Sequence, residues 1–96
     1  MVVGICRVEL HIPDNDSLKG KRQVLRSIKD KVRNKFNVSI AEVDGQDLWQ
    51  QAILGISCVS SSASHANEVL SKVINLIDQN HDSFIVDYEM DLNSWQ

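Results

Sequence analysis

The fold is decided by residues 2–36, which read VVGICRVELHIPDNDSLKGKRQVLRSIKDKVRNKF. Every second position from residue 2 to residue 12 is apolar or glycine, and this period of two predicts a long strand. Pro13 and the polar run after it stop the strand and supply side-chain oxygens that can cap a helix. Apolar residues then recur at steps of three and four from Leu18 to Phe36, which predicts an amphipathic helix of about five turns.

The rest of the chain contains a hairpin and a second strand–helix–strand pattern. A short β-branched strand is expected at 37–43, followed by the turn signal Asp44-Gly45 and a third strand at about 50–60. A serine-rich break precedes a second amphipathic helix that begins at residue 63 and ends near Asn80. Alternation over 84–92 predicts a last, half-buried strand.

These elements predict a single α+β domain over residues 1–96. Two βαβ-like halves joined by a hairpin assemble by default as a ferredoxin-like βαββαβ fold. The sheet is then four-stranded and antiparallel in the order 4-1-3-2, with both helices on one face.

Composition limits the classes of protein to which the chain can belong. An apolar fraction of 43% and a charged fraction of 24% are ordinary for a globular protein. No leader and no membrane span are expected, because Arg7 and Glu9 interrupt the first apolar stretch and no run reaches about 20 apolar residues. Cys6 and Cys58 lie inside expected strands on core-facing positions, which favours a cytoplasmic protein with two buried, reduced thiols. The three histidines share no ligand spacing, so neither a metal nor a cofactor is expected.

The net charge of −3 conceals a strong separation of charge. Residues 17–36 hold eight of the ten basic residues against the single acid Asp30. On a helical projection five of these cations fall within an arc of about 80°, beside the apolar stripe, and extend for about 21 Å. We call them the basic row: Lys19, Arg22, Arg26, Lys29 and Arg33. Such a row suits RNA phosphates or an acidic protein surface, although a solvated helix face is the simplest structural explanation.

The hairpin carries three carboxylates and a tryptophan within residues 41–49. Paired carboxylates can hold Mg²⁺ or transfer protons, but hairpins commonly carry acids that bond turn amides. If the first and third strands pair antiparallel, His11 lies near Trp49. A speculative pocket would then contain Glu9, His11, Glu42 and Asp47, although a packed His–Trp pair is the simpler expectation.

A helix-free sheet face with much apolar area is unusual on a monomer, which suggests a homodimer through that face. The residues assigned to this possible interface are Val3, Ile5, Trp49, Ile53, Val59 and Ile85.

Three known uses of a ferredoxin-like fold lack their motifs here. The segment after the first strand, 12–16, is acidic and contains proline, whereas an acylphosphatase has a glycine-rich phosphate loop there. The first and third strands carry no stacking aromatics of the kind an RNA-recognition motif needs. A metallochaperone would require a paired-cysteine loop, which is also missing.

Residues 17–22, 35–44, 46–50 and 54–55 resemble the YlxP-like family of conserved bacterial proteins. The resemblance covers nearly the whole chain and implies a ferredoxin-like fold. The family is a domain of unknown function without established catalytic residues, and its genes often lie beside translation and ribosome-maturation factors. Family members often complete a capping box with an acid three residues after the capping serine, whereas this chain has Gly20.

Three functions are therefore weighed. The first is a non-catalytic RNA- or ribosome-associated protein that binds through the basic row. The second is a homodimeric interaction module whose basic helix docks an acidic partner. The third, an enzyme or small-ligand binder built on the speculative pocket, is the least favoured.

Overall fold

A computed structural model describes all residues from 1 to 96 and contains four strands and two helices. In chain order they are β1 (Val2–His11), α1 (Leu18–Lys35), β2 (Ser39–Asp44), β3 (Gln51–Ser60), α2 (Ala63–Asp78) and β4 (Phe84–Ser94). The strands form one sheet in the order β2-β3-β1-β4, and all neighbours are antiparallel. This is the predicted order, written from the other edge, so the ferredoxin-like prediction is confirmed.

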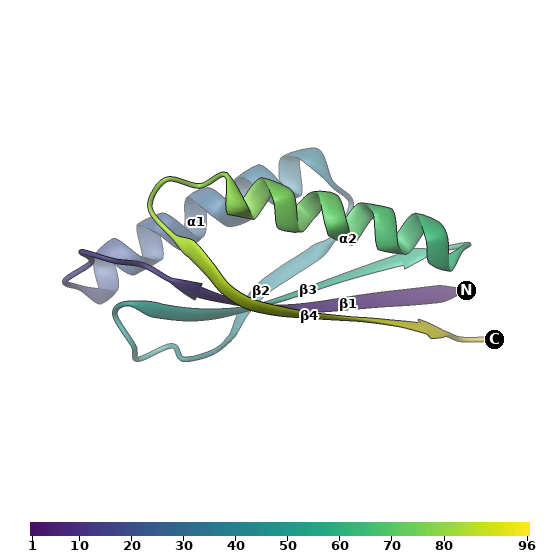
Figure 1. Ribbon diagram of the computed structural model, residues 1–96, viewed down its shortest axis with the longest axis horizontal. Helices are drawn as coiled ribbons and strands as arrows, with labels where there is room; N and C mark the ends of the chain where they lie inside the picture. The colour runs from purple at the N-terminus through teal and green to yellow at the C-terminus, as the bar shows by residue number, and fades with distance from the viewer.

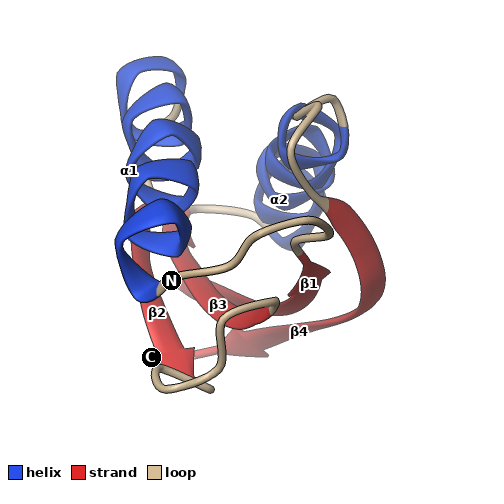
Figure 2. Ribbon diagram, turned by 90° about the vertical axis from the view of Figure 1, so that its left-hand side faces the viewer, coloured by secondary structure: helices blue, strands red, loops and turns tan.

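Both helices cover the same face of the sheet, and the other face carries no helix (Figures 1 and 2). One apolar cluster fills the space between the two layers and includes Val8, Leu54 and Leu70, which are fully buried. The alternating residues of β1 explain this layering. Its even-numbered residues are buried under the helices, while Ile5, Arg7 and His11 are exposed on the other face.

The start of α1 has a capping serine but no capping box, because Gly20 stands where a glutamate or glutamine would complete one. Ser17 Oγ accepts a hydrogen bond from the Gly20 backbone nitrogen at 3.0 Å, so the capping serine is in place. A Cβ atom at residue 20 would overlap Asn15 Oδ1. The Asn15 amide donates both to the Ser17 carbonyl at 2.8 Å and to the Trp49 carbonyl. Asn15 thus occupies the space a longer side chain at residue 20 would need, and it ties the helix start to the β2–β3 loop.

A bulge in β4 corrects one prediction about its faces. Strict alternation assigned Ile85 to the helix-free face and to the possible interface. The pairing of β1 with β4 shifts register between Glu9 and Leu10, so that Glu9 pairs with Asp87 but Leu10 pairs with Ile85. One extra residue reverses the alternation before it. Ile85 therefore packs against the core, whereas Val86 is 59% exposed.

Both cysteine side chains are free and buried, as their strand positions predicted. Burial raises the pKa of the Cys6 thiol from its ordinary value to about 11, because the thiolate would lose its hydration. Neither α1 nor α2 has the length and apolar character needed to cross a membrane.

Candidate functional site

The basic row lies on one flank of α1, and its last member, Arg33, contacts β2. Four of its members, Lys19, Arg22, Arg26 and Arg33, are exposed, and Lys29 is half-buried. The molecule contains only two ion pairs, Lys21–Glu42 and Lys72–Glu68, and neither involves the row. The five cations therefore present a positive field with no carboxylate within 4 Å to neutralise it.

Arg33 differs from the rest of the row because it already has a partner in the protein. Its Nη2 atom donates a hydrogen bond to the Ile40 carbonyl of β2 at 2.9 Å. This contact fixes the carboxyl end of α1 beside the β2 edge of the sheet. Lys19, Arg22, Arg26 and Lys29 make no such bond and remain free to meet an external anion.

Lys21 has a role that was not predicted from the sequence, because it is buried and bonds the β2–β3 loop. It is 1% exposed, and its Nζ atom donates to the Gly45 and Leu48 carbonyls, each at 2.7 Å. Glu42 Oε2 lies 2.8 Å from the same nitrogen as an ion-pair partner. Two carbonyl acceptors and one nearby carboxylate thus compensate a cation that would otherwise be costly to bury.

A signal for Lys21 was present in the sequence. Residue 21 precedes Leu25, Ile28 and Val32 at steps of four, three and four, so it falls within the apolar stripe of the helix and not within the basic row. A lysine at such a position needs buried oxygens, and the nearby hairpin provides them.

The β2–β3 loop is held against the start of α1 by several polar contacts. The Lys21 side chain of α1 donates hydrogen bonds to two carbonyls of the loop. The Asn15 side chain, in the β1–α1 connection, donates to a third. Gln50 Nε2 returns a bond to the Asn15 carbonyl at 3.0 Å, and the Ile12 backbone nitrogen donates to the Gln50 carbonyl at 2.8 Å. The carboxylate-rich hairpin is thus a fixed part of the fold, and Glu42 has a structural partner.

The structure does not bring the four residues of the speculative pocket together. Glu42 pairs with Leu54 in the sheet and points to the helix side, where it meets Lys21. Glu9 and His11 lie on the opposite side of the sheet, and Asp47 is exposed in the loop. No group of three histidine, cysteine or acidic side chains is arranged to hold a metal ion.

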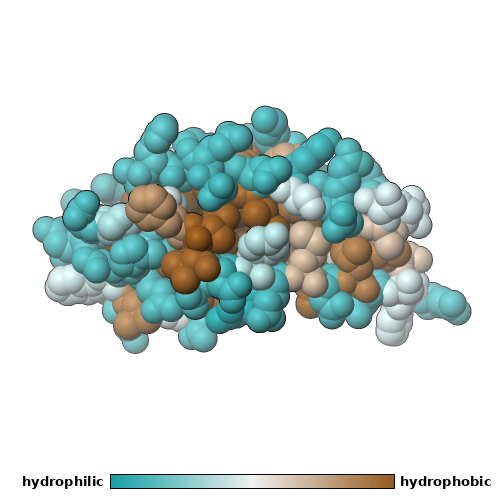
Figure 3. All heavy atoms as spheres, in the orientation of Figure 1, coloured by the Kyte–Doolittle hydropathy of each residue, from teal (hydrophilic) through white to brown (hydrophobic).

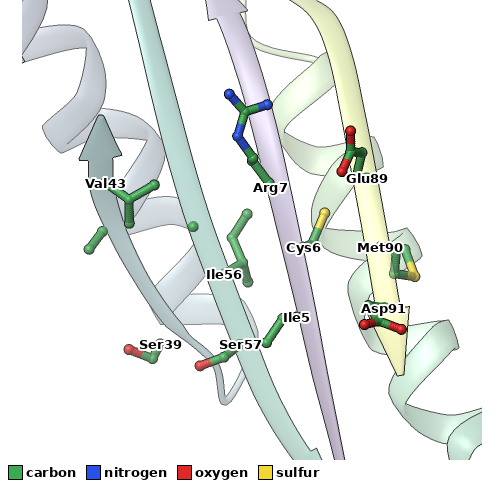
Figure 4. A pocket seen from close by; sticks show the side chains of 12 residues that line it. Ile5, Cys6, Arg7, Ser39, Val43, Ile56, Ser57, Glu89, Met90 and Asp91 are labelled. Atoms are coloured by element: carbon green, nitrogen blue, oxygen red, sulfur yellow. The ribbon is translucent and has the colours of Figure 1, made fainter. Parts of the chain in front are cut away.

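The helix-free face is shallowly hollowed and carries mixed chemistry. A hollow of about 730 Å³ extends across all four strands. Among the residues that line it, Arg7 of β1 lies beside Glu89 of β4 (Figure 4). Of the residues predicted for an interface, Ile5, Trp49 and Val59 are exposed, Val3 is half-buried, and Ile53 is 4% exposed. A row of carboxylates follows β4 on this face, because Asp87, Glu89 and Asp91 pair with Glu9, Arg7 and Ile5 of β1.

Comparisons with known proteins identify the family of the chain. Residues 3–90 match the family model described as "Protein of unknown function (DUF503)". The chain is 46% identical over 77 residues to "Uncharacterized protein YlxP" of Bacillus subtilis (strain 168), covering 80% of this chain and 84% of that one.

Two designed proteins share the fold without sequence similarity. The de novo designed protein Foldit4 superposes with a TM-score of 0.56 at 10% identity, over 100% of both chains. The de novo designed protein LFR1 1, described as having a ferredoxin fold, gives a TM-score of 0.52 at 12% identity, over 99% of this chain and 88% of that one. At such identities the likeness concerns the fold alone. The family match and the 46% identical relative show that the chain belongs to the DUF503, YlxP-like family.

Proposed function

We propose that this protein is a non-catalytic RNA-binding protein that contacts RNA phosphates through the basic row of α1. The observation that carries the proposal is the absence of carboxylate partners along that row. Exposed helices usually mix signs through pairs four residues apart, and such a pair stabilises α2 as Glu68–Lys72. A helix that keeps its cations unpaired retains the charge that a polyanion needs.

RNA is favoured over an acidic protein as the partner because of the row's shape. Four free cations stand in single file on one arc, a geometry that follows a phosphate backbone. Lys19 lies in the first turn of α1, where the helix dipole disfavours a cation by a few tenths of a kcal/mol, and no carboxylate of the protein offsets that cost. An acidic protein as the true partner is one outcome of the following test.

The test measures binding of ribosomal RNA fragments as a function of salt concentration. Four phosphate contacts predict that the logarithm of the association constant falls against the logarithm of salt concentration with a slope of about −3 for single-stranded RNA. Replacing Arg22→Glu and Arg26→Glu together should weaken binding about tenfold or more and make the slope shallower by about 1.4. Arg33 is left intact because its bond to Ile40 is part of the fold.

A matched control comes from the other flank of the same helix. Lys31→Glu with Lys35→Glu makes the same change in net charge, and both side chains are exposed outside the row. At a salt concentration that screens the overall field of the protein, the association constant of the control for RNA should stay within about threefold of that of the unmodified protein. Equal loss in both variants, or no RNA binding at about 50 mM salt, would refute a phosphate-binding row and favour an acidic protein partner.

Homodimerisation through the helix-free face remains a second candidate, favoured by the exposed Ile5 and Val59. Two copies facing each other would also bring the carboxylates of both β4 strands together with a single Arg7 from each. Such a dimer should therefore tighten as salt rises, in contrast to RNA binding, because salt screens like-charge repulsion. Light scattering at about 0.05 and 0.5 M salt measures this, and Ile5→Asp should give a monomer. A monomer at both salt concentrations would exclude the dimer.

A further inference from the structure

Besides the basic row, the free edge of β4 is a surface that could bind a partner. β4 is 11 residues long and pairs with β1 on one side only, because it ends the strand order β2-β3-β1-β4. An edge strand presents backbone N–H and C=O groups that can template another strand. The opposite edge is less open, because β2 has six residues, a register shift between Glu42 and Asp44, and a carbonyl already bound by Arg33.

Apolar surface borders this free edge. Phe84, Val86 and Tyr88 are 61%, 59% and 52% exposed, and they lie at and on either side of the bulge in β4. Ile85, Met90 and Leu92 are only partly buried against the core. The view with α2 and β4 nearest the reader shows hydrophobic atoms gathered beneath α2 along the course of β4 (Figures 1 and 3). A strand added to β4 would cover part of this surface.

The charges of β4 identify the kind of strand that fits. Asp87, Glu89 and Asp91 lie at alternate positions on the helix-free face, and no lysine or arginine lies within 4 Å of their carboxylates. Tyr88, Met90 and Leu92 alternate with them and pair with the helix-facing residues of β1. An incoming strand therefore meets carboxylates on one face and apolar side chains on the other.

A second copy of this chain is a poor occupant of the edge. Antiparallel pairing of two β4 strands about a twofold axis would place six carboxylates on one face, and like charges opposite one another destabilise a sheet. Charged edge residues are a common means of preventing such self-association. The same carboxylates attract a basic strand.

We propose that β4 accepts an extended basic segment of another protein as a fifth strand. Its lysine or arginine side chains would alternate with apolar ones, so that the cations meet Asp87, Glu89 and Asp91 while the apolar residues cover Tyr88, Met90 and Leu92. Backbone hydrogen bonds supply affinity in this kind of strand addition, and the alternation supplies specificity. The surface is separate from the basic row of α1, so the proposal stands or falls independently of RNA binding.

The experiment uses a capped eight-residue peptide of alternating lysine and valine, with alternating glutamate and valine as the control peptide. Titration followed by hydrogen exchange should show that the lysine peptide slows exchange of amides within 84–94 and leaves those of β2 unchanged. The glutamate peptide should not bind. N-methylation of alternate peptide nitrogens should abolish the protection, because it removes the donors of a new ladder.

Two triple variants with the same change in net charge separate the β4 row from general electrostatics. Asp87→Asn, Glu89→Gln and Asp91→Asn together should weaken peptide binding by between about threefold and a hundredfold, because three opposite-charge pairs are lost from the new strand pairing. Asp30→Asn, Asp47→Asn and Asp78→Asn should leave it nearly unchanged. Three results would overturn the proposal: equal weakening in both variants, binding without protection of 84–94, or protection of 84–94 that grows with protein concentration in the absence of peptide. The last result would assign the edge to a second copy.

Discussion

Replacing Lys21 with methionine is expected to lower the free energy of unfolding by about 2–4 kcal/mol. Methionine keeps most of the unbranched stem but removes the ammonium group that bonds the Gly45 and Leu48 carbonyls. The carboxylate of Glu42 then loses its ion-pair partner in a mostly buried position. Urea unfolding measures the loss as a lower midpoint at an unchanged slope.

Local motion should change together with stability in this variant. The β2–β3 loop is joined to α1 through Lys21, so amide exchange at residues 45–50 should accelerate more than exchange elsewhere. Lys31→Met is the matched control, because residue 31 is exposed on the same helix, and its effect should stay within about 0.5 kcal/mol.

A double variant tests whether the unpaired Glu42 carboxylate causes the loss of stability in Lys21→Met. Lys21→Met combined with Glu42→Gln should recover part of the loss, since the unpaired carboxylate is removed. The ion pair does not hold the loop if Lys21→Met is as stable as the Lys31→Met control. The same follows if the double variant loses the sum of the two single losses of unfolding free energy.

Replacing Leu70 with alanine is expected to destabilise the protein by about 2–5 kcal/mol. Leu70 is fully buried in α2 and lies directly over Gly4 of the central strand β1. Removing its side chain leaves a cavity between the helix layer and the sheet. Val59→Ala is the control, because Val59 is 69% exposed, and it should change stability by less than about 0.5 kcal/mol.

Gly4 provides an internal check on this packing. A Cβ atom at residue 4 would lie 2.9 Å from Leu70 Cδ1 and 3.2 Å from Cys58 Sγ, so Gly4→Ala alone overpacks the core and should cost about 1–3 kcal/mol. In the Leu70→Ala background the added methyl group enters the cavity. The double variant should therefore be more stable than the sum of the two single effects predicts. Strict additivity would show that the two residues do not share this space.

The larger part of the fold follows from periodicity. The alternation in residues 2–12 and the steps of three and four in residues 18–36 identified β1 and α1, and they also placed Cys6 among buried residues. The limit of this reasoning is visible at Ile85. A pattern of period two carries no information about where a bulge inserts one residue, because a bulge arises when β4 pairs with a strand distant in sequence.

In the candidate site, too, some features follow from local sequence and others depend on contacts between distant segments. The basic row was found from spacing alone, since the place of its five cations on one arc depends only on the helical period. Arg33 and Lys21 were counted with the other cations, yet Arg33 bonds β2 and Lys21 is buried under three oxygens. Their partners lie 7 to 27 residues away in the chain, and only the folded sheet brings them within reach.

Sequence by itself determined the element order, the layer that each strand residue faces before any bulge, and the concentration of positive charge on α1. These properties are local, because they depend on the periods of helix and strand and on residue type. Tertiary structure decided which cations remain free, which acids are unpaired along β4, and which sheet edge is open. Those properties depend on which distant groups meet, and the balance between burying a charge and pairing it is settled only when the layers pack together.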